Sequence, residues 1–363
     1  MTPPRVAVFV SPHGFGHAAR ASAVMEAVHR ATGAQFELFA ASPRWFFDES
    51  VAGLYRYHDV VTDVGFRQRS ALTYDLEATT SALEGMLPFD EALVDRLAAR
   101  LAATGCRVVV CDIAPLGIAV AERAGLPSVL VQNFTWPWLY EPLFSRAPGL
   151  RPFAEELEGW FGRASLHLLA EPYCLDDSRA HGVVLPVSRT ARRGRDEVRA
   201  SLGLNPADRV VVVTMGGVPE ALPFLSRLRA LPDVTFLVTG AERTRADGNV
   251  HLFDNHTRIY MPDLVRASDA VVAKLGYSTV AEVWREGRPL AFVTRADFRE
   301  TAPLRDWVSA AIPGFEVHGE DFASGGWIQR IPALLETDPP APRPAGGAEQ
   351  VADHLRRWLS NRS

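Results

Sequence analysis

Short apolar runs alternate with amphipathic segments along the first half of the chain. The runs with strand character are Val6–Val10, Phe36–Ala40, Arg107–Cys111, Ser128–Gln132, Leu166–Ala170 and Val183–Leu185. The segments between them carry apolar residues at helical spacing, as at Ala18, Ala21 and Val24. Buried strands that alternate with helices predict an α/β protein with a parallel sheet.

A second α/β series follows. Its expected strands are Val210–Thr214, Val234–Thr239, Arg258–Tyr260, Ala270–Ala273 and Pro289–Val293. Between the two series, Pro186 to Arg209 is rich in arginine and reads as a linker with a short helix. Pro339 to Gly347 is rich in proline and glycine, and Ala348 to Leu359 has the apolar spacing of a helix. We therefore expect two α/β domains, residues 1–186 and 187–345, and a terminal helix, 346–363, that returns to the first domain.

The segment that begins the first series combines a strand, a glycine turn and a histidine. The apolar run Val6–Val10 is followed by Gly14 and Gly16, which allow a tight turn, and His17 lies on the first turn of the next helix. The loop after a strand in an α/β sheet lies at the carboxyl edge, where ligands bind. His17 is therefore expected to face a cleft.

Two other interpretations of this segment are open. A glycine-rich turn before a helix can bind a dinucleotide. Here, however, Ala19 follows Gly14 and Gly16, and no acidic residue ends the strand Phe36–Ala40 to bind a ribose. His17 could also be a structural residue of the helix.

Polar residues end two further strands of the first series. Asp112 follows the run that ends at Cys111, and Asn133 follows Gln132, so both fall on the same sheet edge as His17. Asp112 can be a helix cap or a functional acid. The aromatic residues after the second strand are Phe134, Trp136, Trp138 and Tyr140. They pack in the core or form the wall of an apolar acceptor pocket.

The second series has its own candidate site. Gly216 and Gly217 follow its first strand, and their amides could face an anion. The stretch Lys274-Leu-Gly-Tyr-Ser-Thr-Val-Ala-Glu282 places glycine, hydroxyls and a carboxylate at the start of a helix. A helix N-terminus beside Lys274 can hold a diphosphate, and Glu282 can accept hydrogen bonds from ribose hydroxyls.

This stretch resembles the donor-binding motif of GT-B nucleotide-sugar glycosyltransferases. The plant enzymes have His-x-Gly-x-Asn-Ser-x-x-Glu, and the matching residues here are Lys274, Gly276, Ser278, Thr279 and Glu282. Asp269-Ala-Val-Val and Glu286-Gly-Arg-Pro289 resemble the N-acetylglucosaminyltransferase of lipid II synthesis. The resemblance covers nearly the whole chain. It implies two Rossmann-like domains whose parallel sheets face a central cleft, with a C-terminal helix that crosses back to the first domain.

The resemblance also implies roles for individual residues. His17 matches the general base and Asp112 the aspartate that orients it, so the expected reaction is an inverting sugar transfer to a hydroxyl-bearing acceptor. No metal or cofactor is expected, because the helix dipole and Lys274 can neutralise the leaving diphosphate. The donor is expected to be UDP-linked. The implied donor-binding residues are Gly16, Gly216, Gly217, Tyr260, Met261, Lys274, Gly276, Ser278, Thr279, Glu282, Asp297 and Glu300. The acceptor, a small molecule or a lipid-linked one, is expected at Phe134, Trp136 and Trp138.

Two alternative functions share these residues. Gly14-Phe-Gly-His-Ala-Ala-Arg20 also matches the Gly-x-Gly-His-x-x-Arg of the nucleotide-sugar hydrolase in pseudaminic acid synthesis, where histidine activates water. The aromatic residues after Asn133 favour an organic acceptor over water. A noncatalytic nucleotide-sugar sensor is the second alternative, and the presence of both His17 and Asp112 argues against it.

Composition narrows the remaining classes. The 363 residues are 47% hydrophobic with a formal net charge of −5, so the chain can bury two cores and nucleic acid is not an expected main partner. Three cysteines without ligand spacing suggest neither a disulfide framework nor a zinc site. No apolar stretch reaches the ~18 residues of a membrane-spanning helix. A cytoplasmic protein is expected.

Overall fold

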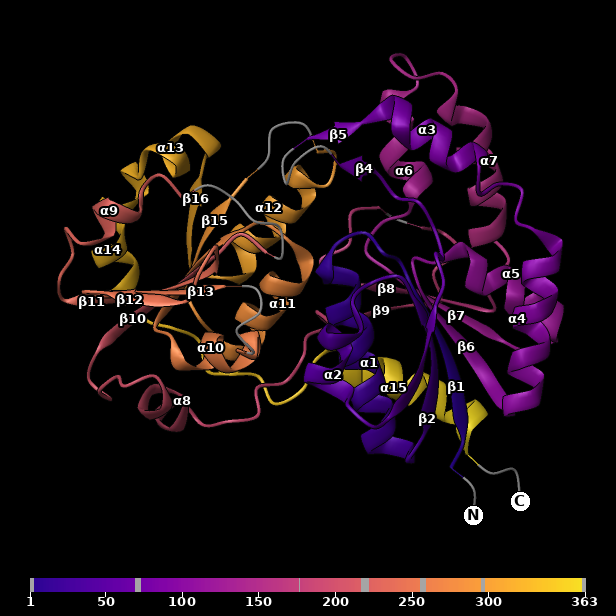
Figure 1. The fold of residues 1–363 in the computed structure, drawn as a ribbon, viewed down its shortest axis with the longest axis horizontal. Helices are drawn as coiled ribbons and strands as arrows, with labels where there is room; N and C mark the ends of the chain where they lie inside the picture. The colour runs from indigo at the N-terminus through magenta and orange to yellow at the C-terminus, as the bar shows by residue number, and fades with distance from the viewer. Residues whose placement is uncertain are drawn as a thin grey trace. The chain divides into compact units, whose positions relative to one another are not determined.

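The computed structural model describes residues 3–68, 73–175, 177–216, 222–254, 259–294 and 298–360. The chain divides into two compact units. Unit 1 consists of Met1–Val187 together with Ala345–Ser363, and unit 2 consists of Ser188–Pro344. Within the described residues each unit is built on one seven-stranded sheet (Figure 1).

The sheet of unit 1 is parallel throughout. Its strands, in spatial order, are β3 (Tyr55–Asp59), β2 (Gln35–Ala40), β1 (Arg5–Val10), β6 (Cys106–Asp112), β7 (Ser128–Gln132), β8 (Leu166–Ala170) and β9 (Gly182–Val184). The strand order reverses direction between β1 and β6, so these two strands form the topological switch point at which such sheets bind ligands.

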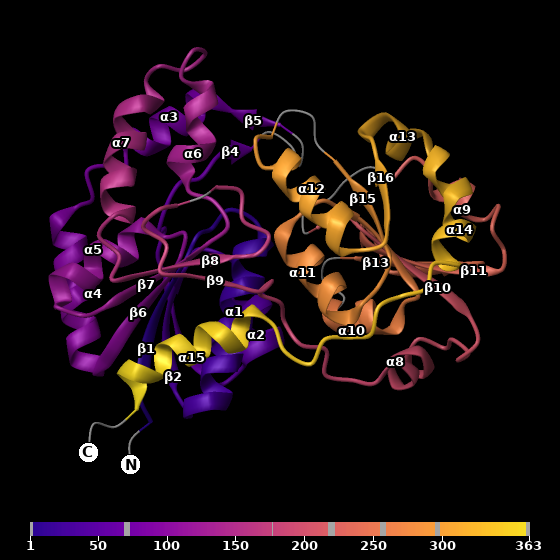
Figure 2. The same ribbon diagram turned by 180° about the vertical axis from the view of Figure 1, so that it is seen from behind.

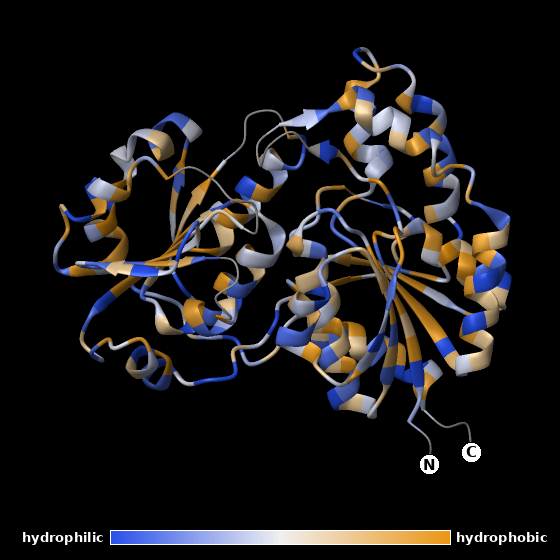
Figure 3. Cartoon of the chain, viewed as in Figure 1, coloured by the Kyte–Doolittle hydropathy of each residue, from blue (hydrophilic) through white to orange (hydrophobic). Residues whose placement is uncertain are grey.

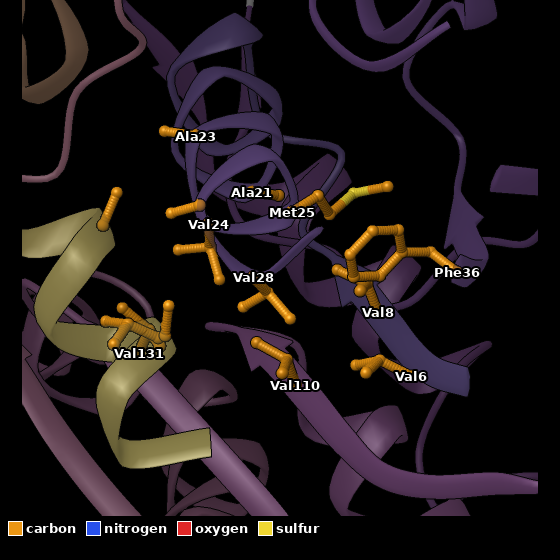
Figure 4. Packing of buried hydrophobic residues seen from close by; sticks show 14 of the residues in the cluster. Val6, Val8, Ala21, Ala23, Val24, Met25, Val28, Phe36, Val110 and Val131 are labelled. Atoms are coloured by element: carbon orange, nitrogen blue, oxygen red, sulfur yellow. The ribbon is translucent and has the colours of Figure 1, made fainter. Parts of the chain in front are cut away.

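Helices cover both faces of this sheet. The helices of unit 1 are α1 (Phe15–Thr32), α2 (Arg44–Val51), α3 (Leu76–Glu84), α4 (Glu91–Thr104), α5 (Pro115–Ala124), α6 (Trp136–Tyr140), α7 (Leu150–Phe161) and α15 (Gly347–Leu359). A short 3-10 helix, η1 (Glu141–Leu143), and a hairpin of β4 (Arg67–Gln68) and β5 (Tyr74–Asp75) complete it. Helices α1, α2 and α15 share one core with the sheet. Figure 4 shows Val24 and Val28 of α1 against this core, with Val8 and Val110 on the strands.

The terminal helix α15 belongs to unit 1 because its start fits closely against the end of the sheet. A Cβ atom at Gly347 would lie 1.9 Å from the Leu185 carbonyl oxygen, so only glycine allows this approach. Glu349 accepts the Gly346 amide at 2.9 Å and so caps the helix. Leu355 and Val351 are fully buried in the core shared with α1. Figure 2 shows α15 alongside α1.

Unit 2 repeats the same plan. Its strands, in spatial order, are β12 (Arg245–Asp247), β13 (Val250–Asp254), β11 (Val234–Ala241), β10 (Arg209–Thr214), β14 (Ala270–Lys274), β15 (Leu290–Val293) and β16 (Gly314–Val317). All neighbours are parallel except β12, which is antiparallel to β13. The order reverses between β10 and β14, which makes that pair the switch point of unit 2.

Two helical layers enclose the second sheet. The helices are α8 (Arg195–Ser201), α9 (Leu225–Leu228), α10 (Met261–Ala267), α11 (Tyr277–Glu286), α12 (Thr301–Ala311), α13 (Gly319–Ser324), η2 (Gly326–Arg330) and α14 (Ile331–Leu335). One face of the sheet packs against α9, α13 and α14, and the other against α10, α11 and α12. Figure 3 shows the strands of both sheets as mainly hydrophobic, in agreement with sheets covered on both faces.

The predicted fold class is confirmed, and most expected strands are present within one or two residues of their predicted bounds. The strand expected at Arg258–Tyr260 is wrong: Arg258 lies outside the described residues, and Tyr260 caps α10. The strand of this region is β13, which begins at Val250. The edge strand β3, Tyr-Arg-Tyr-His-Asp, escaped prediction because its residues are only partly buried and it therefore lacks an apolar run.

Candidate functional site

The switch point of unit 1 brings His17 and Asp112 into contact. Val10 and Asp112 are paired in the β1–β6 register, and Gly14, with φ +76°, turns the chain from β1 into α1 so that His17 lies on the first helical turn. The His17 Nδ1 atom lies 2.7 Å from Asp112 Oδ1. An ionised carboxylate can only accept, so Nδ1 carries the proton and Nε2 is left to take one.

Arg20 holds the carboxylate of this pair in place. Its Nε lies 2.6 Å from Asp112 Oδ2 and its Nη2 lies 2.7 Å from Asp112 Oδ1. Its Nη1 donates to Asn133 Oδ1, and Asn133 donates in turn to the Ala170 carbonyl at 2.5 Å. Burial would raise the pKa of Asp112, but the Arg20 charge and the hydrogen bonds from Arg20 and His17 hold it below its ordinary value. Asp112 therefore stays ionised beside the histidine at neutral pH.

Sequence reasoning noted Arg20 only as part of a motif and gave Asn133 no role. The i, i+3 spacing from His17 to Arg20 was the available signal, since it places both side chains on one helix face. The helix-cap alternative for Asp112 is not what the structure shows, because the cap of the next helix, α5, is Ala114.

Two aromatic rings of unit 1 lie close to the His17 ring. The ring centroids of Phe134 and Trp136 lie 6.1 and 6.2 Å from that of His17. Phe134 is 4% exposed and Trp136 is 1% exposed, so these two rings pack in the core, as one of the two interpretations expected. Trp138 is half-buried on α6. Contact of these three residues with an acceptor stays a prediction.

A second buried carboxyl group, that of Asp63, contacts one of these rings. Asp63, in the loop after β3, accepts hydrogen bonds from Ser11 Oγ at 3.0 Å and from Trp136 Nε1 at 2.9 Å. Burial raises its pKa to about 7, the two hydrogen bonds oppose this shift, and the charge of Asp112 adds to it. Sequence reasoning missed Asp63 because the strand before it was not recognised.

The switch point of unit 2 brings Gly216 and Lys274 together. Gly216 follows β10 with φ +81°, and a Cβ atom there would lie 3.7 Å from Lys274 Nζ. The Gly216 amide donates to Thr214 Oγ1 at 3.3 Å. Gly276 caps α11, and Ser278 and Thr279 are partly exposed on its first turn. The arrangement puts an ammonium group and a helix N-terminus at one sheet edge, as an anion site requires.

Lys274 is also the only lysine among the 38 lysine and arginine residues of the chain. A compact ammonium differs from a planar guanidinium in how it contacts phosphate oxygens. The use of lysine at this one position sets it apart from the arginine-based ion pairs of the rest of the protein.

Glu282 lies two turns into α11 and is paired with Arg189. Glu282 is 2% exposed, and its Oε1 lies 2.9 Å from Arg189 Nε. Burial raises the pKa of Glu282, Arg189 opposes this shift, and Glu286 adds to it. The guanidinium carbons of Arg189 and Arg192 lie 5.1 and 4.6 Å from the ring centroid of Tyr260. Arg189 therefore connects Tyr260 to Glu282, a role that sequence reasoning did not assign.

The remaining predicted positions are less informative. Met261 begins α10 and Glu300 caps α12, and both are partly buried, as is Gly16 in unit 1. Gly217 and Asp297 lie outside the described residues. Within the described ranges no group of three or more His, Cys, Asp or Glu residues could hold a metal ion. Every helix in those ranges is too short or too polar to cross a membrane.

Comparisons with known proteins bear on the fold. No family model matches the chain. It is 27% identical over 360 residues to "L-arabinokinase" of Arabidopsis thaliana, a match that covers 96% of this chain and 34% of that protein. The chain thus spans about a third of the length of this curated relative.

Solved structures of glycosyltransferases are among those similar to the chain. A UDP-glucosyltransferase from Polygonum tinctorium capable of glucosylating indoxyl has a TM-score of 0.65 at 14% identity, with 99% of both chains covered. Arabidopsis thaliana UGT89C1, complexed with quercetin, has a TM-score of 0.66 at 16% identity, with 99% of this chain and all of that chain covered. Acinetobacter baumannii MurG has a TM-score of 0.55 at 12% identity, with 98% of this chain and all of that chain covered. The chain therefore has the GT-B fold, with two Rossmann-like domains.

Proposed function

We propose that the protein is an inverting, metal-independent glycosyltransferase that moves a sugar from a nucleoside diphosphate sugar to a hydroxyl-bearing acceptor. The observation that carries this proposal is the contact of His17 Nδ1 with Asp112 Oδ1. That contact leaves Nε2 as a base, and the carboxylate stabilises the imidazolium that forms when Nε2 takes a proton.

The chemistry then has four parts. The acceptor oxygen attacks the anomeric carbon, and His17 Nε2 takes the hydroxyl proton as the new C–O bond forms. The bond from the anomeric carbon to the phosphate oxygen breaks, and the nucleoside diphosphate leaves. Lys274 and the N-terminus of α11 would hold the leaving diphosphate, and Glu282 would accept from its ribose. Attack from the face opposite the leaving group inverts the anomeric configuration.

Uridine is the proposed base because the Polygonum tinctorium protein is named a UDP-glucosyltransferase. The base would lie near Tyr260 and Met261. The name of the Arabidopsis relative adds L-arabinose to the sugars and acceptors worth testing.

A panel of nucleotide sugars tests the reaction. The purified chain is incubated with UDP-glucose, UDP-N-acetylglucosamine and UDP-L-arabinose, each with and without phenolic, lipid-linked and sugar acceptors, in the presence of EDTA. We expect slow release of free sugar without acceptor, faster UDP release with one of the acceptors, and an inverted anomeric configuration by NMR. Fast hydrolysis that acceptors do not change would instead show a nucleotide-sugar hydrolase.

Nucleotide binding by unit 2 can be measured without turnover. Glu282→Ala should weaken UDP binding by roughly 1–3 kcal/mol, the usual cost of losing a charged hydrogen-bond acceptor, and Lys274→Ala should weaken it similarly. Isothermal titration calorimetry measures both. Glu336→Gln is the control in the same unit, because Glu336 caps the end of α14, is 67% exposed at its side chain and pairs with Arg209 on the surface. It should leave UDP affinity unchanged.

The single lysine gives a direct probe of the same site. Reductive methylation with ¹³C-formaldehyde labels only Lys274 and the chain's N-terminal amine, and it keeps the lysine charge. UDP should shift the dimethyl-lysine NMR signal, while uridine should shift it little. Unchanged affinity in both variants and an unshifted lysine signal would reject this nucleotide site.

A further inference from the structure

Asp63 links the segments that surround His17. Ser11 Oγ donates to Asp63, the Ser11 amide donates to the Asp112 carbonyl at 3.2 Å, and the His13 amide lies 3.5 Å from Ser11 Oγ. Ser11 starts the turn that leads from β1 into α1, and His17 lies on the first turn of that helix. Asp63 therefore holds the start of this turn through a hydrogen bond.

Asp63 also fixes the ring that packs nearest this turn. Its second oxygen accepts from Trp136 Nε1, and Trp136 lies 5.1 Å from the His13 ring and 6.2 Å from the His17 ring, centroid to centroid. The loop of Asp63 passes so close that a Cβ atom at Gly65 would lie 2.9 Å from the Trp136 ring. Trp136 therefore has little freedom to move unless Asp63 moves with it.

The chemical setting of Asp63 differs from that of Asp112. Asp112 has a guanidinium and a histidine as partners, whereas the two donors to Asp63 are a hydroxyl and an indole, both neutral. A buried carboxylate with neutral donors is costly to keep charged, and an asparagine could make both hydrogen bonds without that cost. An acid at this position therefore calls for an explanation beyond packing.

We propose that Asp63 is a positioning residue of the transfer reaction, which sets the His17 turn through Ser11 and Trp136 and whose negative charge assists proton uptake by His17. The inference rests on the proposed function. In its ionised form Asp63 accepts from both donors. When protonated, it can donate to Ser11 Oγ and still accept from Trp136, so Asp63 keeps both of its hydrogen bonds in either state.

The proposed role can be tested through pH, because the charge of Asp63 changes with pH. Burial raises the pKa of Asp63 to about 7, so its charge changes near neutral pH. The ionisable groups on the elements around it are His13 on the turn after β1, His17 and Arg20 on α1, Asp112 at the end of β6 and Tyr140 on α6. The lowered pKa of Asp112 keeps it ionised at neutral pH, so the charge that changes on Asp63 is distinct from that of Asp112.

Asp63→Asn tests the proposal, because the amide mimics the protonated acid: its Nδ2 donates to Ser11 and its Oδ1 accepts from Trp136. An anionic carboxylate near a base favours the protonated form of that base. We expect kcat of the variant to equal that of the wild type near pH 6 and to be about tenfold lower near pH 8, with an unchanged KM for the donor. The ratio of the two rates should change with a midpoint near the pKa of Asp63, about 7.

Stability separates this role from a structural one. A carboxyl with a folded pKa above its unfolded value contributes stability at low pH that is lost as pH rises through the folded pKa. Asp63→Asn removes that loss, so its melting temperature near pH 8 should be no lower than that of the wild type although it is less active. If Asp63 were only a structural residue, Asp63→Asn would instead lose stability and activity together, at every pH.

A second experiment does not depend on turnover and follows the NMR signal of the Trp136 indole N–H. Its ¹H–¹⁵N signal, assigned by its absence in Trp136→Phe, should titrate near pH 7 in the wild type and not in Asp63→Asn. A signal that does not titrate, or a rate ratio that is independent of pH, overturns the proposal. If no nucleotide sugar is turned over, the proposed function and the positioning role fail together, and the indole titration still shows whether Asp63 ionises.

Discussion

Replacing His17 by alanine should lower turnover by about 10²–10⁴-fold, the usual loss when a positioned general base is removed. UDP affinity should stay nearly intact, because the proposed nucleotide contacts belong to unit 2. The structural reason is the His17–Asp112 contact, which leaves Nε2 as the only ring nitrogen able to take the acceptor's proton. Steady-state kinetics measure kcat, and calorimetry measures UDP binding.

Asp112 and His17 should not act independently. Asp112→Asn should reduce turnover less than His17→Ala, and the double variant should be little worse than His17→Ala, because an orienting residue has no effect on a missing base. His29→Ala is the control: His29 lies on the same helix, and its Nδ1 contacts the Ala34 carbonyl at 2.8 Å. Losses that add up, or normal turnover without His17, would contradict the assignment.

The fold was largely readable from the sequence because both sheets are covered on two faces. Strands buried on both sides appear as uninterrupted apolar runs, as in Val210 to Val213, all at most 1% exposed. Where a strand lies at a sheet edge, as β3 and β16 do, most of its residues are exposed or only partly buried, and the apolar run disappears. The first and last residues of a strand are often only partly buried. The hydrophobic pattern of the sequence therefore does not predict where a strand begins and ends.

Part of each candidate site could also be predicted from the sequence, for a related reason. Residues that end neighbouring parallel strands meet at one edge, so the approach of His17 to Asp112, and of Gly216 to Lys274, follows from topology. The partners Arg189 and Asp63 come from segments without a regular pattern, and no spacing along the chain relates them to Glu282 or to Trp136. Only the folded structure shows those contacts.

Among the residues around His17 and Asp112, Arg20 should be the one whose replacement lowers the free energy of unfolding most. Arg20→Ala leaves the Asp112 carboxylate buried without its guanidinium and leaves Asn133 without a donor. Removing one partner of a buried ion pair costs about 3–5 kcal/mol, because the remaining charge stays desolvated. Arg20→Lys should recover part of this loss, since lysine keeps the charge but cannot make the same set of contacts.

The pH dependence of the loss identifies its cause. In the wild type the lowered pKa of Asp112 gives stability that is present above its ordinary unfolded pKa of about 3.9 and is lost as pH falls through the folded value. In Arg20→Ala, burial should raise the pKa of Asp112 above the unfolded value, so that the variant loses stability as pH rises. The difference in unfolding free energy between wild type and variant should therefore be larger at pH 7 than at pH 5.

Urea unfolding at the two pH values, followed by circular dichroism and tryptophan fluorescence, measures this difference. Arg44→Ala is the matched control in unit 1, because Arg44 is 67% exposed at its side chain and lies 3.6 Å from Asp48 in a surface pair. Such pairs contribute about 0–1 kcal/mol, so the control should change stability little at either pH. A loss of equal size at pH 5 and pH 7 in Arg20→Ala would mean that lost packing around the arginine side chain, rather than the stranded charge of Asp112, accounts for the damage.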